Sequence, residues 1–177
     1  MFLLNYKSNL TKALAGIVQR YNPKKYWKMR EYVIAPRSRQ MCNIIKKVWY
    51  LYRIKRMDAF NNASMGTNIG FGAHFEGIPK FPHGLNGIIV SPYAKIGRNA
   101  YIFQQVTIGD DGVSKFNVPV IGDNVTLYAG CKVVGKCRIG NNAKIGANAV
   151  VSFDVPDNAL VVCEKPKIKI IKKEIKK

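Results

Sequence analysis

The sequence predicts a mainly β fold, a parallel β-helix that follows a short basic α-helical region. Three observations predict it. The second half of the chain has a strict period of six residues, glycine and asparagine recur at the turns of that period, and the basic first third has no such period. The chain has 177 residues, 47% of them hydrophobic, which is enough for one folded domain with a small appendage.

The hexads begin at Val90 and are interrupted once. The chain reads VSPYAK, IGRNAY, IFQQVT and IGDD, and it resumes from Ile121 as IGDNVT, LYAGCK, VVGKCR, IGNNAK, IGANAV and VSFDVP. An aliphatic residue opens each hexad, and a small or β-branched residue takes the fifth place. A helix needs apolar residues three and four apart, so this period excludes one.

Six residues fit one short strand and one turn. Three such units make a triangular coil in which residues 18 apart stack on each other, and each coil buries its faces against its neighbours. Gly and Asn at the turns allow left-handed backbone conformations. With a spacing of roughly 4.8 Å per coil, about five coils make a prism on the order of 24 Å long.

The cysteines are explained by packing. Cys131 and Cys137 both take the small fifth place of a hexad, so a catalytic or metal-binding thiol is not expected there. Together with Cys42 and Cys163 they have the spacing of neither a disulfide framework nor a zinc site. We expect a cytoplasmic protein, because the chain starts without a secretory signal and no apolar run reaches the roughly 18 residues that span a bilayer.

The chain divides into three parts by composition. Residues 1–66 carry 14 Lys and Arg against 2 acidic residues, residues 161–177 carry 7 against 2, and residues 67–160 carry 8 against 6. We therefore expect a basic helical region over 1–66, a β-helix over 67–164 with a loop excursion at 109–120, and a basic tail over 165–177. The tail alternates Ile and Lys, so it is expected to form a last strand or to fray.

The basic ends suggest three partners. No helix-turn-helix, RNP or zinc-finger signature accompanies the net charge of +19, so nucleic acid is not expected. Anionic lipids and a phosphate-rich cofactor remain, as does a simple solvated surface.

Helical patterns occur near residues 9–20, 24–34 and 39–58. The third pattern has apolar residues on one face and cations interleaved among them: Ile44, Ile45, Val48, Leu51 and Tyr52, with Lys46, Lys47, Arg53, Lys55 and Arg56. Such a face favours packing on the core or on a neighbouring subunit. The alternative is a helix that lies on the inner face of a membrane.

Two breaks in the repeat are the candidate functional segments. His83 lies in FPHGLNGIIV, where Phe81 and Val90 are nine residues apart instead of six. Extra residues at a corner push the chain outward, so His83 is a candidate general base, whereas His74 lies in a regular hexad. The excursion at 109–120 is the second break, and such loops on a regular scaffold tend to carry function. The alternative for a lone histidine is a hydrogen-bonded surface or core residue.

The run PHGLNGIIVSPYAKIG followed by IFQQVTIG resembles the serine acetyltransferase branch of the left-handed β-helix acyltransferases. It resembles more closely the short O-acetyltransferases encoded with bacterial surface-polysaccharide genes. The resemblance covers about residues 67–168. It implies a left-handed coil, a homotrimer with each active site between two prisms, acetyl-CoA as the acyl donor without a metal, and His83 as the catalytic base.

The departures from serine acetyltransferases concern the acceptor. Those enzymes carry Asp fifteen residues before the histidine and Asp directly before it, where this chain has Asn68 and Pro82. They also carry an Arg-His pair that recognises the serine carboxylate, and neither residue occurs at the matching positions in Lys115 to Val118. We therefore expect the acceptor to be a hydroxyl of a sugar or of a surface-polysaccharide precursor. Serine O-acetylation, N-acetylation of a nucleotide-linked amino sugar and a non-catalytic β-helix scaffold remain alternatives.

The expected chemistry assigns roles around the histidine. His83 takes the proton of the acceptor hydroxyl as it attacks the thioester carbonyl, and backbone N–H groups beside Gly109 and Asp110 stabilise the oxyanion. The imidazole is oriented by Asn68, by Glu76 or by a backbone carbonyl, between which the sequence does not decide.

Further contacts are expected for acceptor and donor. Gln104 and Gln105 are expected to point outward and to bind sugar hydroxyls, unless they ladder with neighbouring coils. The resemblance implies that the pantetheine arm passes Ala129 and Ala147. It also implies that the nucleotide phosphates of CoA meet Lys165 and Lys167.

Overall fold

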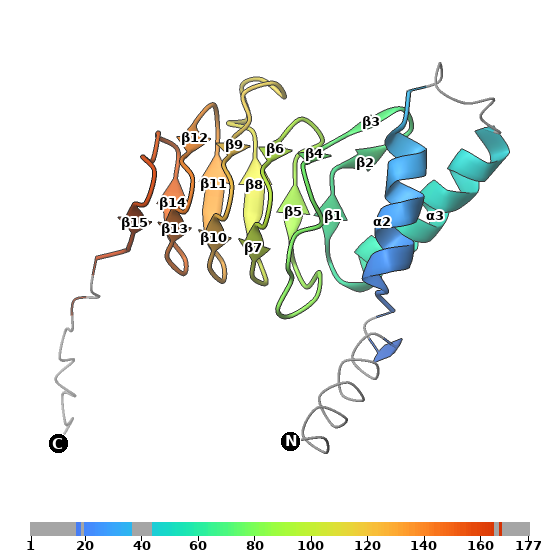
Figure 1. Cartoon of the computed structure of the whole chain (residues 1–177), viewed down its shortest axis with the longest axis horizontal. Helices are drawn as coiled ribbons and strands as arrows, with labels where there is room; N and C mark the ends of the chain where they lie inside the picture. The colour runs from blue at the N-terminus through green and yellow to red at the C-terminus, as the bar shows by residue number, and fades with distance from the viewer. Residues whose placement is uncertain (1–16, 19, 37–43, 165–166, 168–177) are drawn as a thin grey trace, which may run out of the picture.

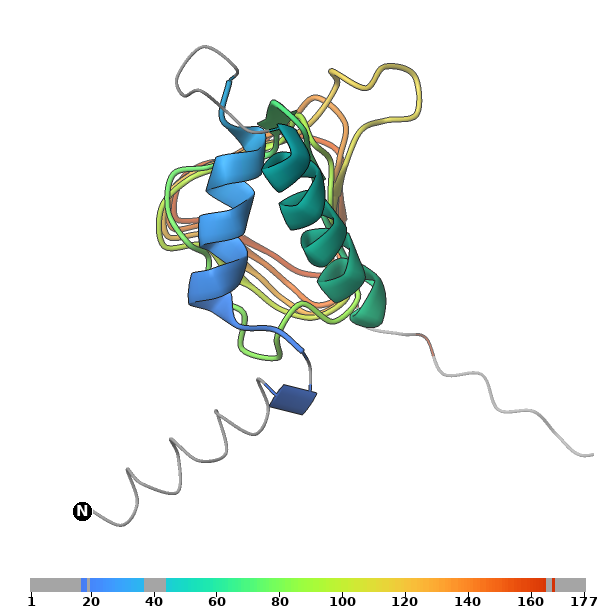
Figure 2. The ribbon, with the colours of Figure 1, turned by 90° about the vertical axis from the view of Figure 1, so that its right-hand side faces the viewer.

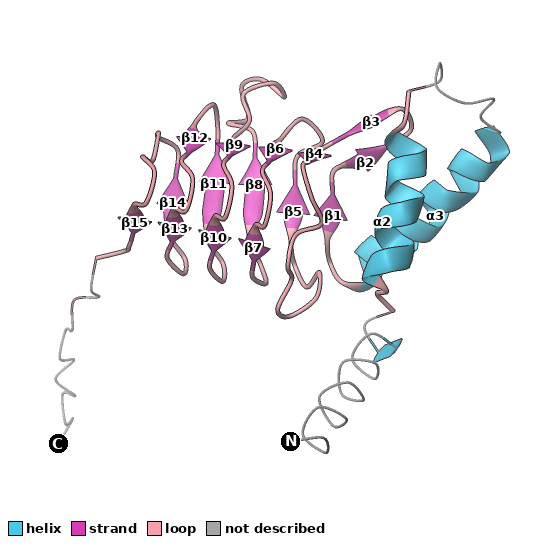
Figure 3. Cartoon of the chain, in the orientation of Figure 1, coloured by secondary structure: helices cyan, strands magenta, loops and turns pink. Residues whose placement is uncertain are grey.

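The structure is a computed structural model, and it describes residues 17–18, 20–36, 44–164 and 167. Most of the predicted helix over 9–20 lies outside these residues, and so does the basic tail apart from Lys167. Helices α2 (Pro23–Ile34) and α3 (Ile44–Phe60) cover one end of a β-helix (Figures 1 and 3). Within the described part of the chain, no helix is both long enough and apolar enough to cross a membrane.

The β-helix is a triangular left-handed prism whose three faces are parallel sheets (Figure 2). Face 1 contains β1 (Ser64–Met65), β5 (Ile89–Val90), β8 (Thr107–Gly109), β11 (Lys132–Val134) and β14 (Val150–Val151). Face 2 contains β4 (His74–Phe75), β6 (Lys95–Ile96), β9 (Val120–Ile121) and β12 (Arg138–Ile139). Face 3 contains β7 (Tyr101–Ile102), β10 (Thr126–Leu127), β13 (Lys144–Ile145) and β15 (Leu160–Val161).

The register confirms the period. Ile89 pairs with Thr107 and Thr126 with Lys144, so one regular coil takes 18 residues. Thr107 pairs with Lys132, 25 residues on, because the excursion adds to that coil. An antiparallel hairpin of β2 (Thr67–Asn68) and β3 (Phe71–Gly72) is inserted into the first coil.

The interior is built as the hexads predict. Every aliphatic residue that opens a hexad is at most 2% exposed: Val90, Ile96, Ile102, Ile108, Ile121, Leu127, Val133, Ile139, Ile145 and Val151. The fifth positions, Cys131 and Cys137 among them, are at most 5% exposed. Stacked aliphatic side chains therefore form a continuous core, and burying each one contributes about 1.5–3 kcal/mol.

We name the corners of the prism by the faces they join. Corner 1/2 comprises residues 66–73, 91–94, 110–119, 135–137 and 152–154. Corner 2/3 comprises residues 76–79, 97–100, 122–125, 140–143 and 156–159. Corner 3/1 comprises residues 81–88, 103–106, 128–131 and 146–149.

Asparagine shapes corner 2/3. Asn99, Asn124, Asn142 and Asn158 have φ between +56° and +61°, a region that Asn tolerates better than most residues. Each amide donates to the next along the prism, at 3.2, 3.1 and 3.0 Å. The hydrogen-bond ladder therefore holds successive coils in register.

A buried arginine joins α2 to the first coil. Arg30 is 2% exposed; its guanidinium donates to the carbonyl oxygens of Met65 and Ala73 at 3.3 and 2.5 Å and lies over the rings of Trp27 and Phe75. These hydrogen bonds and ring contacts replace part of the water that the guanidinium loses on burial, which limits the cost of its desolvation. Burial still lowers the pKa of Arg30 to about 10.

The orientation of α3 differs from the sequence-based expectation. Its buried residues are Lys47, Ile54 and Asp58, whereas Val48 and Tyr52 of the expected packing face are each 52% exposed. The reason lies in the partners of the buried polar groups. Lys47 donates to the carbonyl oxygen of Ala35, and Asp58 accepts from the hydroxyl of Tyr26 at 2.7 Å. Of the expected packing face, Leu51 packs against the core, whereas Ile44, Ile45, Val48 and Tyr52 are exposed.

Candidate functional site

The loop that carries His83 is an insertion at corner 3/1 of the first coil. Leu85 and Ile88 anchor it, because both side chains are fully buried. Gly84 and Gly87 have φ of +69° and +67°, which lets the backbone turn sharply between these anchors. His83 therefore stands on the outside of the loop, where it is exposed.

The ring of His83 faces an aromatic column. Its centroid lies 5.9 Å from that of Phe103, and Phe103 stacks on Tyr128 at 5.3 Å. In the part of the chain that the structure describes, the imidazole of His83 has no hydrogen-bond partner. Sequence reasoning missed this column, although Phe103 and Tyr128 stand where half of the hexads have Gly.

Corner 3/1 brings five of the predicted site residues onto one edge of the prism. They are His83, Gln104, Gln105, Ala129 and Ala147. Backbone hydrogen bonds connect the steps of this edge: Gln105 donates to Asn86, Gly130 to Gln104 and Asn148 to Ala129, at 2.9, 3.0 and 2.9 Å. The edge therefore runs from the His83 loop toward the C-terminal end of the β-helix.

The two glutamines of this edge differ. Gln105 is exposed and has φ of +61°. Gln104 is half-buried, and its side-chain oxygen is buried without a hydrogen-bond partner among the described residues. The expectation that both side chains point outward therefore holds for Gln105 and is wrong for Gln104. Ala129 and Ala147 have small side chains, whereas Phe103 and Tyr128 place aromatic rings on the same edge.

The other predicted site residues lie at other corners of the same protomer. Asn68 and Asp110 lie at corner 1/2, and Gly109 ends β8 directly before that corner. Both views place the β2–β3 hairpin and the excursion opposite the loop before β5 (Figures 1 and 2). Glu76 lies at corner 2/3, where its carboxylate is 3.8 Å from Arg98. Within one protomer, neither Asn68 nor Glu76 meets His83.

The excursion has a defined structure of its own. The carboxylate of Asp111 accepts from the backbone N–H groups of Val113 and Ser114 and from the amide of Asn117, at 2.9, 3.1 and 2.8 Å. These hydrogen bonds, with that from Ser114 first, lower the pKa of Asp111. The loop therefore holds its shape and projects from the prism.

An aromatic cluster lies at the base of the excursion. Tyr93 stacks on Phe71 at 5.8 Å and meets Phe116 edge-on at 4.9 Å. The ammonium of Lys115 lies 5.8 Å from the ring of Tyr93 and 5.2 Å from that of Phe116. Sequence reasoning did not find this cluster, because its members come from three separate segments of the chain.

The remaining candidates carry less information. Lys167 is exposed, and Lys165 lies outside the described residues. Burial raises the pKa of the Cys131 thiol to about 12, which fits an unreactive core residue. Across residues 17–18, 20–36, 44–164 and 167, no cluster of His, Cys, Asp or Glu is arranged to hold a metal ion.

Comparisons with known proteins agree with this architecture. Residues 119–152 match the family model described as bacterial transferase hexapeptide (six repeats). Serine acetyltransferase from Mycobacterium tuberculosis is 42% identical over 77 residues, which is 43% of this chain and 34% of that protein.

Solved structures show the same likeness. Serine acetyltransferase from Neisseria gonorrhoeae in complex with serine matches with 32% identity and a TM-score of 0.54, over 70% of this chain and 49% of that one. A serine acetyltransferase in complex with CoA matches with 26% identity and a TM-score of 0.58, over 77% of this chain and 50% of that one. The chain thus spans about a third of the curated relative and half of the solved structures.

Proposed function

We propose that this chain is an acetyl-CoA-dependent O-acetyltransferase with His83 as its general base. The observation that carries the proposal is the exposed imidazole of His83 at corner 3/1, beside the rings of Phe103 and Tyr128. The likeness to a serine acetyltransferase that binds CoA supports acetyl-CoA as the donor. Exposed Lys167, with Lys165, is the candidate contact for the CoA phosphates.

The reaction needs little more than positioned groups. His83 takes the proton of the acceptor hydroxyl while the oxygen bonds to the acetyl carbonyl carbon. The tetrahedral oxyanion collapses, the carbon–sulfur bond breaks, and the thiolate of CoA takes the proton back from the imidazolium. Backbone N–H donors near the oxyanion stabilise it most when their geometry is fixed in advance.

We propose that the site is completed by a second prism. Gly109 ends β8 and Asp110 opens corner 1/2, away from His83 of the same protomer. In a trimer with threefold symmetry, one surface of each subunit meets a different surface of the next. We infer that corner 3/1 of one prism lies against corner 1/2 of its neighbour. The excursion and its aromatic cluster would then face His83 of the neighbour.

Two acceptors compete, and each has its own support. The relatives are serine acetyltransferases, one of them solved with serine, so the comparisons favour serine, the second choice of the sequence analysis. A sugar hydroxyl is favoured by Lys115 and Phe116, which stand in the segment where the Arg-His pair is absent. The rings of Phe71, Tyr93 and Phe116 offer apolar faces on which a sugar ring can stack.

One assay separates the two acceptors. The purified full chain is given acetyl-CoA with L-serine, and in parallel with hexoses, amino sugars and a surface-polysaccharide oligosaccharide, and release of CoA thiol is recorded. Thiol release that depends on serine would establish serine as the acceptor and would exclude the proposed sugar acceptor. If thiol release depends on none of the acceptors, and the His83→Ala variant releases thiol at the same rate as the parent, the proposal that the chain is an acetyltransferase fails.

We also propose a localisation: the cytoplasm, at the inner face of the membrane. A lipid-linked polysaccharide precursor is available at the inner face of the membrane, and the basic region 1–66 would favour contact with anionic lipids there. Among the exposed side chains of α2 and α3, Glu31 is the acidic one.

A further inference from the structure

Helix α3 presents a cationic and aromatic surface to the solvent. We define this outer face of α3 by residues that recur every three or four positions: Val48, Trp49, Tyr52, Arg53, Arg56 and Phe60. Trp49, Tyr52 and Phe60 are 53%, 52% and 49% exposed. Aromatic side chains of this size are usually buried, so a row of them in water indicates an interaction surface.

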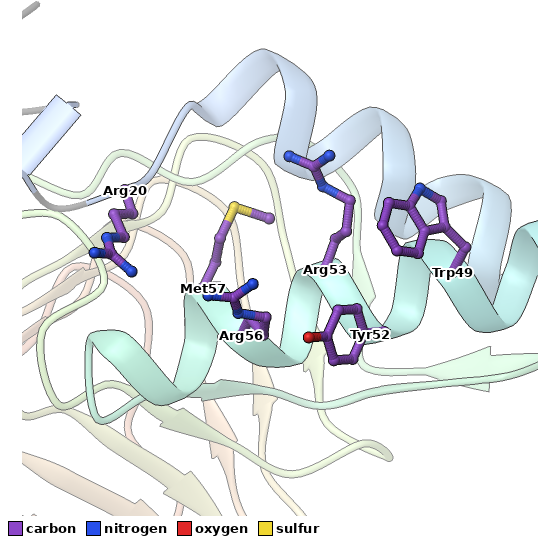
Figure 4. A pocket seen from close by; sticks show the side chains of 6 residues that line it. All are labelled: Arg20, Trp49, Tyr52, Arg53, Arg56 and Met57. Atoms are coloured by element: carbon purple, nitrogen blue, oxygen red, sulfur yellow. The ribbon is translucent and has the colours of Figure 1, made fainter.

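Three guanidinium groups gather around one pocket on this face. The pocket has a volume of about 270 Å³ and is lined by Arg20, Trp49, Tyr52, Arg53, Arg56 and Met57 (Figure 4). Arg53 lies 5.8 Å from the ring of Trp49, Arg56 5.9 Å from that of Tyr52 and Arg20 4.7 Å from that of Phe60. No carboxylate lines the pocket, and both ion pairs found in the described part of the chain belong to Arg98.

The chemistry of this surface selects an anion beside an apolar phase. Arginine binds phosphate oxygens through paired N–H groups, and three such groups without a counter-ion attract a phosphate strongly. Trp and Tyr are enriched where lipid headgroups meet hydrocarbon. We propose that the outer face of α3 binds the phosphate headgroups of an anionic lipid bilayer, with Trp49, Tyr52 and Phe60 inserted at the interface. The inference deepens the membrane contact proposed above and does not require acetyl transfer.

Other occupants fit less well. A symmetric contact between two copies of this face would bring Arg53 and Arg56 against the same residues of the partner, where like charges repel. A small soluble anion would use the guanidinium groups but would leave Val48, Trp49 and Phe60 in water. A bilayer satisfies both the cations and the apolar side chains.

The position of α3 gives the contact a consequence. The chain just after α3 is joined to the His83 loop, because the backbone N–H of Gly87 donates to the carbonyl oxygen of Asn61 at 2.8 Å. Before α2, the ring of Tyr21 meets that of Phe81 at 6.4 Å. The helices and the His83 loop therefore share one end of the prism (Figure 1), and a bilayer bound to the outer face of α3 would lie at the same end as His83.

The test is sedimentation of the full chain with vesicles, which needs no acetyl transfer. Vesicles of phosphatidylglycerol and phosphatidylcholine should bind it, and vesicles of phosphatidylcholine alone should not. The double variant Arg53→Gln/Arg56→Gln should bind the anionic vesicles about tenfold to thirtyfold more weakly. The matched control is Lys95→Gln/Arg138→Gln, which removes two exposed cations from face 2 and should bind as the parent does.

A second readout places the helix at the interface. The chain has two tryptophans, and Trp27 is 3% exposed while Trp49 is 53% exposed. Anionic vesicles should shift the emission of a Trp27→Phe protein to shorter wavelength.

Three results would overturn the inference. They are unchanged binding of Arg53→Gln/Arg56→Gln, an equal loss in the face 2 control, and displacement from vesicles by millimolar inorganic phosphate, which would indicate a soluble-anion site. A vesicle-independent association with an acidic protein through the same residues would also replace the lipid assignment.

Discussion

At the residue scale, the position of His83 is the feature from which the function was inferred. The interrupted repeat predicts an outward loop there, and the structure shows an exposed imidazole held up by buried Leu85 and Ile88. The sequence could place the loop because nine residues do not fit a six-residue step. It could not show what lies beside the ring, because Phe103 reaches it only through the stacking of coils.

We expect His83→Ala to lower kcat by about 10²- to 10⁴-fold, the usual contribution of a general base. The KM for acetyl-CoA and the urea midpoint of unfolding should stay near those of the parent, because the side chain is exposed. His74→Ala, which changes the exposed histidine of face 2, is the control and should retain full activity. Activity within a few-fold of the parent in the His83→Ala protein would refute the mechanism.

A second residue-scale prediction concerns Asp58. Burial raises the pKa of this carboxyl from 3.8 to about 6, against the hydrogen bond from Tyr26 and the charge of Lys55, which lower it. The folded state holds the proton of Asp58 more tightly than the unfolded chain does, so protonation of this carboxyl stabilises the fold. This contribution to the free energy of unfolding is complete below about pH 4 and is lost as the pH rises through about 6.

Urea unfolding across this range should reveal the group. The free energy of unfolding of the parent should fall by on the order of 1–3 kcal/mol between pH 4 and pH 7 relative to Asp58→Asn. Glu31→Gln, at an exposed position of α2, should follow the pH dependence of the parent. If the free energies of unfolding of the parent and of Asp58→Asn depended on pH in the same way, the pKa of Asp58 would not be raised by folding.

At the scale of elements, the hexads were predictable and the helices only in part. The position of every strand from β5 to β14 follows from the aliphatic position, since a one-residue slip would turn the row outward. The orientation of α3 did not follow, because Lys47 and Asp58 found partners on Ala35 and Tyr26. Apolar periodicity gave no sign that Lys47 and Asp58 would be buried, because the groups that satisfy them lie on α2 and directly after it.

The asparagine ladder gives a prediction at this scale. Asn142 has φ of +58°, donates to Asn158 and accepts from Asn124. Asn142→Gly should lose the hydrogen bonds, each worth about 0.5–1.5 kcal/mol, while keeping the turn. Asn142→Ala should lose about 1–2 kcal/mol more, the cost of a left-handed conformation for a residue with Cβ. Thermal unfolding of the two variants measures the difference, and equal stability would show that backbone strain is not the reason for Asn at this corner.

At the scale of the whole molecule, the division of the site between corners makes assembly the decisive property. Corner 3/1 carries His83, while corner 1/2 carries Asp110, the excursion and the aromatic cluster. The sequence could not reveal this division, because the residues alternate along the chain and separate only when the coil closes into three faces. We expect light scattering to give three times the mass of one chain, and a monomer would leave the proposed site incomplete.

Mixed trimers test whether the site is shared. One parent carries His83→Ala and the other has residues 111–117 replaced by a short Gly-Ser linker, so each alone should be inactive. In a shared site, histidine from one subunit meets the excursion of the next, and one of the three sites in every mixed trimer is intact. Random assembly at equal amounts should therefore restore about a quarter of the parent activity, as threefold symmetry dictates. If each protomer instead carried a complete site, both variants would inactivate every site they enter and mixing would restore nothing. Recovery near a quarter, absent when the two proteins are mixed without subunit exchange, would thus locate the excursion opposite the histidine of the neighbouring prism.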